Sequence, residues 1–369
     1  MRKKMIAKWL VLALLCLAFL SSATAQYGYR EDKGGFSFRV EGWWVTPTGM
    51  GFDVATLNED WVIDANARGG GDVLDVTFES KFSERATMGW DFGEDLGSLM
   101  VSYWNYDEGS SLSRSGDPRS YIIGELLVHP YYSGQGFYDP DFFYDTGRAD
   151  AVDSMASIET TLIDLDFSRN FSFDQKFSGS WRIGLRSFKY EHSFETDYLG
   201  DPMVADAKVL LDVVSETISS DGVGPRVGIS GGYSFSNYFS MYGGLDVSFI
   251  PGKIDSTYIS HNDLEAWDPE AGDEWGPFLF RLSREDRDEN FLIYDFDAGF
   301  KLAIAQKLNL FIGYRFTKME NVIYRMRFAP DKDWYSGAGV DLYANWDAAT
   351  NNQPDLNFAG LYFGIGYKF

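Results

Sequence analysis

The sequence predicts an all-β, transmembrane, antiparallel up-and-down barrel, and three observations lead to that prediction. The last nine residues alternate large apolar with small or polar side chains and end on an aromatic residue, Phe369. A basic amino-terminus precedes a short apolar run and a small-residue cleavage site, as in an export signal. No other segment approaches the ~18 consecutive apolar residues of a spanning helix, although 45% of the residues are hydrophobic. Alternating strands reconcile these facts, because only one face of each strand needs to be apolar in lipid.

Residues 1–25 are predicted to be a secretory signal peptide. Four basic residues accompany the apolar run 9–20, and the small residues that end at Ala25 form the expected cleavage site. The one cysteine, Cys16, lies in the removed segment, so we expect no disulfide and no cysteine metal site in the mature chain. Residues 26–369 are then expected to form a single barrel domain.

The charge of the chain excludes one class of partner and favours another. The formal net charge is −23, and removing a signal peptide with four basic and no acidic residues lowers it to −27. A nucleic-acid partner is therefore not expected. The acidic excess suits solvated loops beside an anionic outer leaflet bridged by divalent cations. The expected partners are outer-membrane lipid, lipopolysaccharide and, during insertion, the barrel-assembly machinery.

Alternation of apolar and polar side chains predicts ten strands. The second, 72–92, is kept whole because its apolar residues hold one parity throughout, whereas a turn would have no reason to preserve the phase. At ~3.3 Å per residue and a tilt of ~40° it spans roughly 50 Å, about twice the apolar band of a membrane. The predicted strands are 36–46, 72–92, 99–106, 158–167, 177–190, 222–235, 239–250, 292–304, 308–316 and 361–369.

The connections between these strands alternate between short turns, expected on the periplasmic side, and long extracellular loops, which supports an even count of ten. Splitting the second strand requires another strand around 121–128 and gives twelve, the alternative count. Residues 204–218 fit either a short amphipathic helix or an extension of the sixth strand, and we favour the extension. The short connections are 93–98, 168–176, 236–238 and 305–307, and the long ones are 47–71, 107–157, 191–221, 251–290 and 325–356.

Parity places charges of both signs inside the barrel. Ten strands lie closer to filled eight-stranded barrels than to open sixteen-stranded ones, but many inward positions are glycine and leave space for water or arginine stems. A narrow pore and a plugged barrel therefore fit the residues equally. The predicted lumen-lining acids are Glu41, Asp91, Asp164, Asp166, Asp246, Asp295 and Asp297, and the bases are Arg39, Arg85, Arg182, Arg186, Arg226, Lys301, Arg315 and Lys368.

Aromatic residues near strand ends predict girdles at the two membrane interfaces. The predicted girdle residues are Trp43, Trp44, Trp90, Trp104, Trp181, Tyr233, Tyr238, Tyr294 and Tyr367. The aromatic carboxy-terminus is also expected to serve as the assembly signal of the barrel. The residues of this predicted signal are Phe363, Ile365, Tyr367 and Phe369.

Several strand motifs together resemble the Legionella-type pore-forming outer-membrane protein family. They are Glu-Gly-Trp-Trp-Val at 41–45, Trp-Arg-Ile-Gly-Leu-Arg at 181–186, Gly-Val-Gly-Pro-Arg-Val-Gly-Ile at 222–229 and Leu-Phe-Ile-Gly-Tyr-Arg-Phe at 310–316. The likeness covers the strands of most of the mature chain but not its loops. It implies a surface-exposed barrel of the bacterial outer membrane that is proposed to form pores, with no catalytic residues to carry over. The resemblance favours a narrow passive pore for ions or small solutes over a non-conducting structural or surface-interaction barrel, with an outer-membrane hydrolase third.

The three histidines do not predict an enzyme. His129, His192 and His261 belong to different external loops or their edges. His192 is followed by Ser193, but neighbouring residues on a strand point to opposite faces and cannot share a proton directly. We therefore expect no catalysis and no cofactor.

Acidic residues suggest two further sites, each with a simpler reading. Asp164 and Asp166 resemble the paired aspartates of omptin proteases, but they lie near the periplasmic end of their strand, so pairing with lumen arginines is favoured. An acidic stretch of the fourth long loop is a calcium candidate, although its spacing matches no known calcium loop and a solvated loop is the default. Its residues are Asp263, Glu265, Asp268, Glu270, Asp273 and Glu274.

Overall fold

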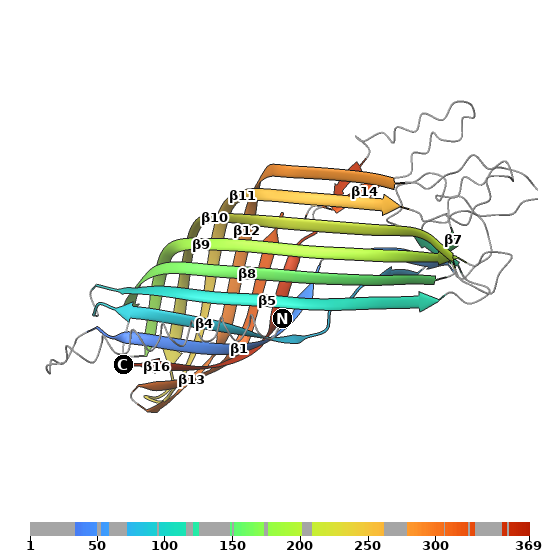
Figure 1. Ribbon diagram of the computed structural model, residues 1–369. Coiled ribbons are helices and arrows are strands. Elements are labelled where there is room, and N and C mark those ends of the chain that lie inside the picture. Colours follow the sequence, from blue (N-terminus) through green and yellow to red (C-terminus); the bar gives the residue numbers. More distant parts are fainter. Residues whose placement is uncertain are drawn as a thin grey trace, which may run out of the picture.

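Ten antiparallel strands close into a barrel in which each strand pairs with its neighbours along the chain and the last pairs with the first (Figure 1). The computed structural model describes residues 34–49, 53–58, 72–93, 96–115, 121–124, 148–149, 151–172, 176–200, 209–261, 279–305, 307–323, 325–328, 349–352 and 354–369. The barrel strands are β1 (Phe36–Thr48), β4 (Lys81–Asp91), β5 (Ser98–Ser115), β8 (Ala151–Ser172), β9 (Phe177–Gly200), β10 (Val209–Ser234), β11 (Phe239–His261), β12 (Leu279–Ala305), β13 (Leu308–Glu320) and β16 (Leu356–Lys368). The predicted fold class and strand count are confirmed.

Six short strands lie outside the barrel. One four-stranded sheet contains β2 (Asp53–Asn58), β3 (Asp72–Asp75), β6 (Tyr121–Gly124) and β7 (Arg148–Ala149), and a ribbon pairs β14 (Arg325–Phe328) with β15 (Ala349–Asn352). The extra strand that a twelve-stranded barrel needs is β6, which pairs with β2 and β7 instead. The alternative count of twelve is therefore wrong. Within the described ranges, no helix is long and apolar enough to cross a membrane.

The prediction of one continuous strand over 72–92 is wrong. β3 ends at Asp75, β4 begins at Lys81, and the residues between them are not in a strand. The even-numbered side chains of β4 face outward, as exposed Phe82 shows, whereas Val76 and Phe78 are buried in the interior cluster. The apolar parity stays constant across this break while the direction of the side chains reverses. Parity alone could not reveal the break.

The barrel wall is tall on one side and short on the other. Strands β8 to β12 have 22 to 27 residues each, whereas β1, β4, β13 and β16 have 11 to 13 (Figure 1). A strand of ~25 residues at ~3.3 Å each is more than twice as long as the apolar band needs. The favoured extension of the sixth strand is confirmed over 209–218, since β10 begins at Val209, and residues 204–208 lie outside the described residues. Parts of the predicted long loops belong to strands, because β8 to β12 extend well beyond the apolar band.

We call the end of the barrel with the short turns its lower end and the end with the long loops its upper end. The outward side chains of the lower half of the wall form an apolar band. Leu185 is 51% exposed, Val227 52% and Ile365 55%, and similar residues follow on every barrel strand. At the closing seam β16 pairs with β1, and the ring centroid of Phe369 lies 5.5 Å from that of Phe36. Lipid is the only solvent in which such a surface is favourable, so this band marks the membrane-spanning part of the barrel.

Candidate functional site in the barrel lumen

Inside the barrel, three zones follow one another from the short turns to the long loops. The lowest zone, which we call the lower lumen, is lined by inward side chains that are partly exposed; they include Ser37, Ser98, Ser180, Ser230, Gly232, Ser240, Lys301 and Asn309. A charged layer follows, then an apolar layer, and the inward side chains of these two layers are almost all buried. Short turns face the periplasm in bacterial barrels, so the lower lumen is the periplasmic end.

Asp164 on β8 is the centre of the charged layer. Arg186 donates to its two carboxylate oxygens from Nε at 2.6 Å and from Nη2 at 3.0 Å. Arg85 Nη2 donates at 3.1 Å and Ser102 Oγ at 3.0 Å, and Arg226 Nη1 lies 3.2 Å away. Such a carboxylate, with three guanidinium groups around it, is stable in a water-poor interior only because the charges are compensated.

Three further aspartates complete this part of the layer. Arg186 Nη1 lies 2.6 Å from Asp295 Oδ2, and Thr317 Oγ1 donates to the other oxygen of Asp295 at 2.6 Å. Arg226 pairs with Asp166 and with Asp246, whose Oδ2 is 3.0 Å from Arg226 Nη2. The ion pair that Arg182 adds to Asp246 is 2.6 Å long. Four arginines and four aspartates therefore neutralise one another across β4, β8, β9, β10, β11 and β12.

A second cluster of the charged layer lies on the short wall. Glu41 on β1 pairs with Arg39 and accepts from Arg315 Nη1 at 3.1 Å. The Arg315 guanidinium carbon lies 4.6 Å from the ring centroid of Tyr362, a favourable cation–π arrangement. Glu41 and Arg315 are both buried. This cluster fills the part of the lumen beside β1 and β13, which the aspartate–arginine network does not fill.

Inward glycines make room for these long side chains. A Cβ atom on Gly228 would collide with the Asp246 carboxylate and lie 2.9 Å from Arg182 Nε, and one on Gly184 would collide with the Asp166 carboxylate. The glycines predicted to free space are thus adjacent to charged side chains, and the arginine stems take up that space.

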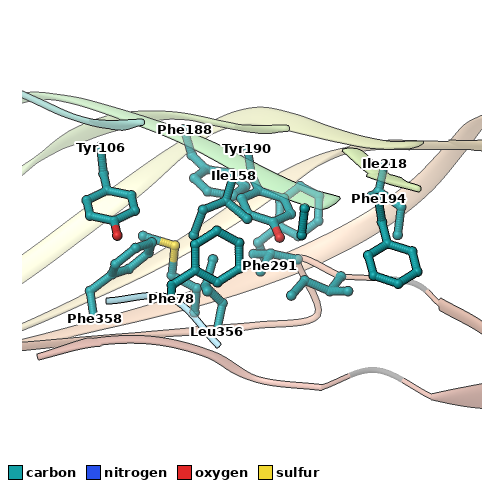
Figure 2. Close-up of a cluster of buried hydrophobic side chains, with 14 of the residues drawn as sticks. Phe78, Tyr106, Ile158, Phe188, Tyr190, Phe194, Ile218, Phe291, Leu356 and Phe358 are labelled. Atoms are coloured by element: carbon teal, nitrogen blue, oxygen red, sulfur yellow. The ribbon is translucent and has the colours of Figure 1, made fainter. Parts of the chain in front are cut away.

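The apolar layer lies above the charged layer, on the loop side. Figure 2 shows its centre, where Phe188 and Tyr190 of β9 face Phe291 of β12, Leu356 and Phe78. The ring centroids of Phe188 and Phe291 are 5.4 Å apart, and those of Tyr106 and Phe358 are 5.2 Å apart in an edge-to-face contact. Val322 and Ile323, which follow β13, join the same cluster. Segments from the short wall thus cover the inner face of the tall wall.

The prediction that Trp43 and Trp104 belong to an interfacial girdle is wrong. They are 1% and 2% exposed, and their ring centroids are 5.1 Å apart inside the barrel. The indole nitrogen of Trp104 donates to Ser83 Oγ at 2.8 Å. Their inward parity was readable in the sequence, but aromatic character alone does not distinguish a lipid interface from an interior. By contrast, Trp44, Trp90 and Trp181 are exposed on the outer face.

The other predicted lumen charges lie below the network or at its edge. Lys368 Nζ donates to Asp91 Oδ2 at 2.7 Å at the periplasmic rim. Tyr362 Oη lies 3.5 Å from Asp297 Oδ2. Lys301 is partly exposed in the lower lumen. Two networks and a rim pair, rather than opposed rows, contain thirteen of the fifteen predicted residues, and Asp297 and Lys301 lie outside them.

The candidate catalytic residues are separated by the barrel wall. His192 is buried on the inner face, where its Nδ1 lies 3.1 Å from Tyr190 Oη, whereas Ser193 points outward and its Oγ is 2.7 Å from Ser157 Oγ. His129 and the six calcium candidates Asp263, Glu265, Asp268, Glu270, Asp273 and Glu274 lie outside the described residues, as do residues 1–25. In the described part of the chain, no group of three or more histidine, cysteine or acidic side chains is arranged to hold a metal ion.

The fold, the apolar outer band and the enclosed polar interior define an integral outer-membrane β-barrel. Comparison with protein families narrows this class: residues 33–369 match the model of the Legionella pneumophila major outer membrane protein precursor. The chain belongs to that family, as the strand motifs indicated. A search of curated proteins found no match.

Solved structures share the barrel architecture at low similarity. The outer membrane protease OmpT of Escherichia coli is 11% identical, with 94% of this chain and all of that chain covered and a TM-score of 0.42. A major outer membrane protein from Thermus thermophilus is 10% identical, with 91% of this chain and 99% of that chain covered and a TM-score of 0.29. A Pseudomonas aeruginosa FadL homologue is 9% identical, with 92% of this chain and 90% of that chain covered and a TM-score of 0.25. Likeness at this level says nothing about function.

Proposed function

We propose that this protein is a non-conducting surface barrel of the outer membrane, which anchors its external strands and loops and does not pass solutes in the described conformation. One observation carries the proposal: two successive layers of inward side chains fill the lumen, and the side chains at their centres, such as Arg186, Arg226, Phe188 and Ile218, are at most 2% exposed. A hydrated passage would leave at least one row of these inward side chains exposed to water.

This proposal reverses the preference for a pore, which came from the family resemblance, since the residues alone fit a pore and a plugged barrel equally. The proposal also includes no catalysis, because Asp164 and Asp166 are engaged by arginines rather than presented to a substrate. Lipid and lipopolysaccharide are the proposed partners of the outer band, and the assembly machinery that of the carboxy-terminal strand.

Planar-bilayer recording tests the closed state. Refolded protein is expected to give no discrete conductance steps, because ions would have to cross both an ion-paired and an apolar layer. Frequent steps of uniform size would exclude it.

Thiol labelling in lipid vesicles tests the same idea without relying on conductance. In a Cys16→Ser background the chain has no cysteine. Ala156→Cys, in the apolar layer, should resist a small charged thiol reagent added on both sides, whereas the neighbouring exposed position, Ser157→Cys, should react. Equal labelling rates at the two positions would contradict a filled lumen.

A narrow pore remains the second candidate, and one observation favours it. The inward side chains of the lower lumen are partly exposed, so the lumen below the charged layer is less tightly filled than the two layers above it. If the layers above separate under voltage, long closed periods interrupted by brief openings are expected in the same recording.

A further inference from the structure

Among the predicted lumen charges, compensation leaves one cation over. Apart from the rim pair of Asp91 and Lys368, these charges comprise six acids and seven bases. Six of these bases form ion pairs with inward acids. Lys301 on β12 is the remaining one: within the described ranges it makes no ion pair or hydrogen bond. Among the described residues, the charged side chain that interacts electrostatically with it is Arg39, which is also a cation.

Geometry brings these two cations to the same place. Lys301 is the register partner of Phe311 on β13, and the guanidinium carbon of Arg39 lies 3.9 Å from the centroid of the Phe311 ring. Glycine at 366 makes this possible, because a Cβ there would lie 2.9 Å from the Phe311 ring. Arg39 therefore reaches across β16 toward the strand beside Lys301.

The polar side chains around Lys301 and Arg39 can donate hydrogen bonds and are partly exposed. Ser240 is the register partner of Lys301 on β11, and Asn309 shares a register row with Gly366 and Arg39. All four polar side chains are partly exposed to the lower lumen. Glu41, the nearest acid on the Arg39 side, is buried and already held by Arg39 and Arg315.

We propose that Lys301 and Arg39, with Ser240 and Asn309, form a binding site for a small oxyanion that enters from the periplasmic end. Arg39 is already paired with Glu41, so Lys301 is the cation that lacks a countercharge. A phosphate or carboxylate group would supply that charge and accept charge-assisted hydrogen bonds from both cations. The site faces the lower lumen, with Arg39 at the lower edge of the charged layer, so it does not depend on whether the barrel conducts.

Isothermal titration of the refolded, full-length protein in detergent with inorganic phosphate tests the proposal. The wild type should bind one phosphate, and Lys301→Met should weaken binding about tenfold or more, the loss of one charge-assisted hydrogen bond. Lys301→Arg should retain binding, because the cation remains. Lys307→Met, at an exposed lysine of the β12–β13 turn, is the matched control and should bind as the wild type does.

Two outcomes would overturn the site: a wild-type protein that binds no phosphate, or a Lys301→Met variant that binds with unchanged affinity. A purely structural role makes a different prediction, since Lys301→Met would then lower stability, whereas removing an uncompensated cation should leave stability unchanged or raise it. Should a variant fail to fold, chemical acetylation of the wild type gives the answer directly. Phosphate should slow modification of Lys301 and not of Lys307, and equal rates would count against the site.

Discussion

The two filled layers of the barrel interior differ in polarity, and in each layer the outer surface has the opposite character. In the charged layer, inward Arg186 is flanked by outward Leu185, which is 51% exposed. In the apolar layer, inward Phe194 is flanked by the exposed polar residues Ser193 and Glu195. Both belong to one strand, β9. The solvent outside the wall, lipid below and water above, therefore decides which face of the same strand is apolar.

The energetic consequence is that the two layers are stabilised by different forces. Apolar side chains inside the upper barrel are removed from water on folding, as in a soluble protein, and contribute roughly 25 cal/mol per Å² of buried apolar area. The charged layer gains nothing from that effect, because a carboxylate in an enclosed interior is favourable only if every partner is in place. Perturbations of the two layers should differ accordingly.

The largest effect is expected for Asp164→Ala. The change leaves Arg85, Arg186 and Arg226 without their shared counterion. We expect a loss of about 3–5 kcal/mol in the free energy of unfolding, the usual cost of breaking a buried ion pair by removing one partner. Urea titration in detergent measures it. Asp153→Ala, at an exposed position of the same strand, is the control, and equal losses for both variants would contradict the central role of Asp164.

A slightly smaller effect is expected for Phe188→Ala in the apolar layer. The ring packs against Phe291 and is 1% exposed. Truncation should cost about 3–4 kcal/mol through lost burial and a cavity. The same urea titration measures this cost, with Ser193→Ala on the outer face as the control. A loss that depends strongly on salt would indicate that electrostatic rather than apolar contacts dominate this layer.

Charge placed on the outer face should locate the boundary between lipid and water. Leu185→Arg introduces a cation into the apolar band and should cost about 2–3 kcal/mol, as charges do on the lipid face of barrels. Glu195→Arg, ten residues along the same face of β9, should change stability by less than about 0.5 kcal/mol because that position faces water. Both follow from urea titration in lipid vesicles. Similar costs at the two positions would mean that the membrane covers the whole of β9.

How much of this could be predicted from the sequence depends on the layer. The strand count, the closing β16 and the inward parity of the charged residues all followed from alternation, because apolar-out and polar-in residues have a single interpretation in lipid. The predicted long loop 191–221 contains Phe194 and Tyr198, although they alternate as regularly as Trp181 and Ile183. The apolar residues of this upper part of β9 have even numbers, whereas those of the lower part have odd numbers. When only lipid-facing residues are counted, this change of parity looks like the end of a strand.

The partners within the charged layer could not be predicted from parity. Asp164 meets Arg186 as a direct register neighbour, which a hairpin alignment supplies. Its contact with Arg85 instead crosses β5, and Arg315 reaches Glu41 across the closing strand β16. These contacts depend on the stagger of strands and on the reach of long side chains over glycine. Neither quantity is written in the alternation of a single strand.

The smallest effect is expected for an ion pair of the same length on the outside of the tall wall. Lys189 Nζ lies 2.6 Å from Glu191 Oε1, the same distance as between Arg186 Nε and Asp164 Oδ1, but the two outer side chains are 58% and 44% exposed. Water screens such a pair, so Lys189→Ala should change the free energy of unfolding by about 0.5 kcal/mol or less, and the difference should vanish in ~1 M salt. Urea titrations at two salt concentrations measure it. A loss approaching that of Asp164→Ala would show that distance rather than enclosure determines the contribution of an ion pair, and the contrast between the inside and the outside of β9 would fail.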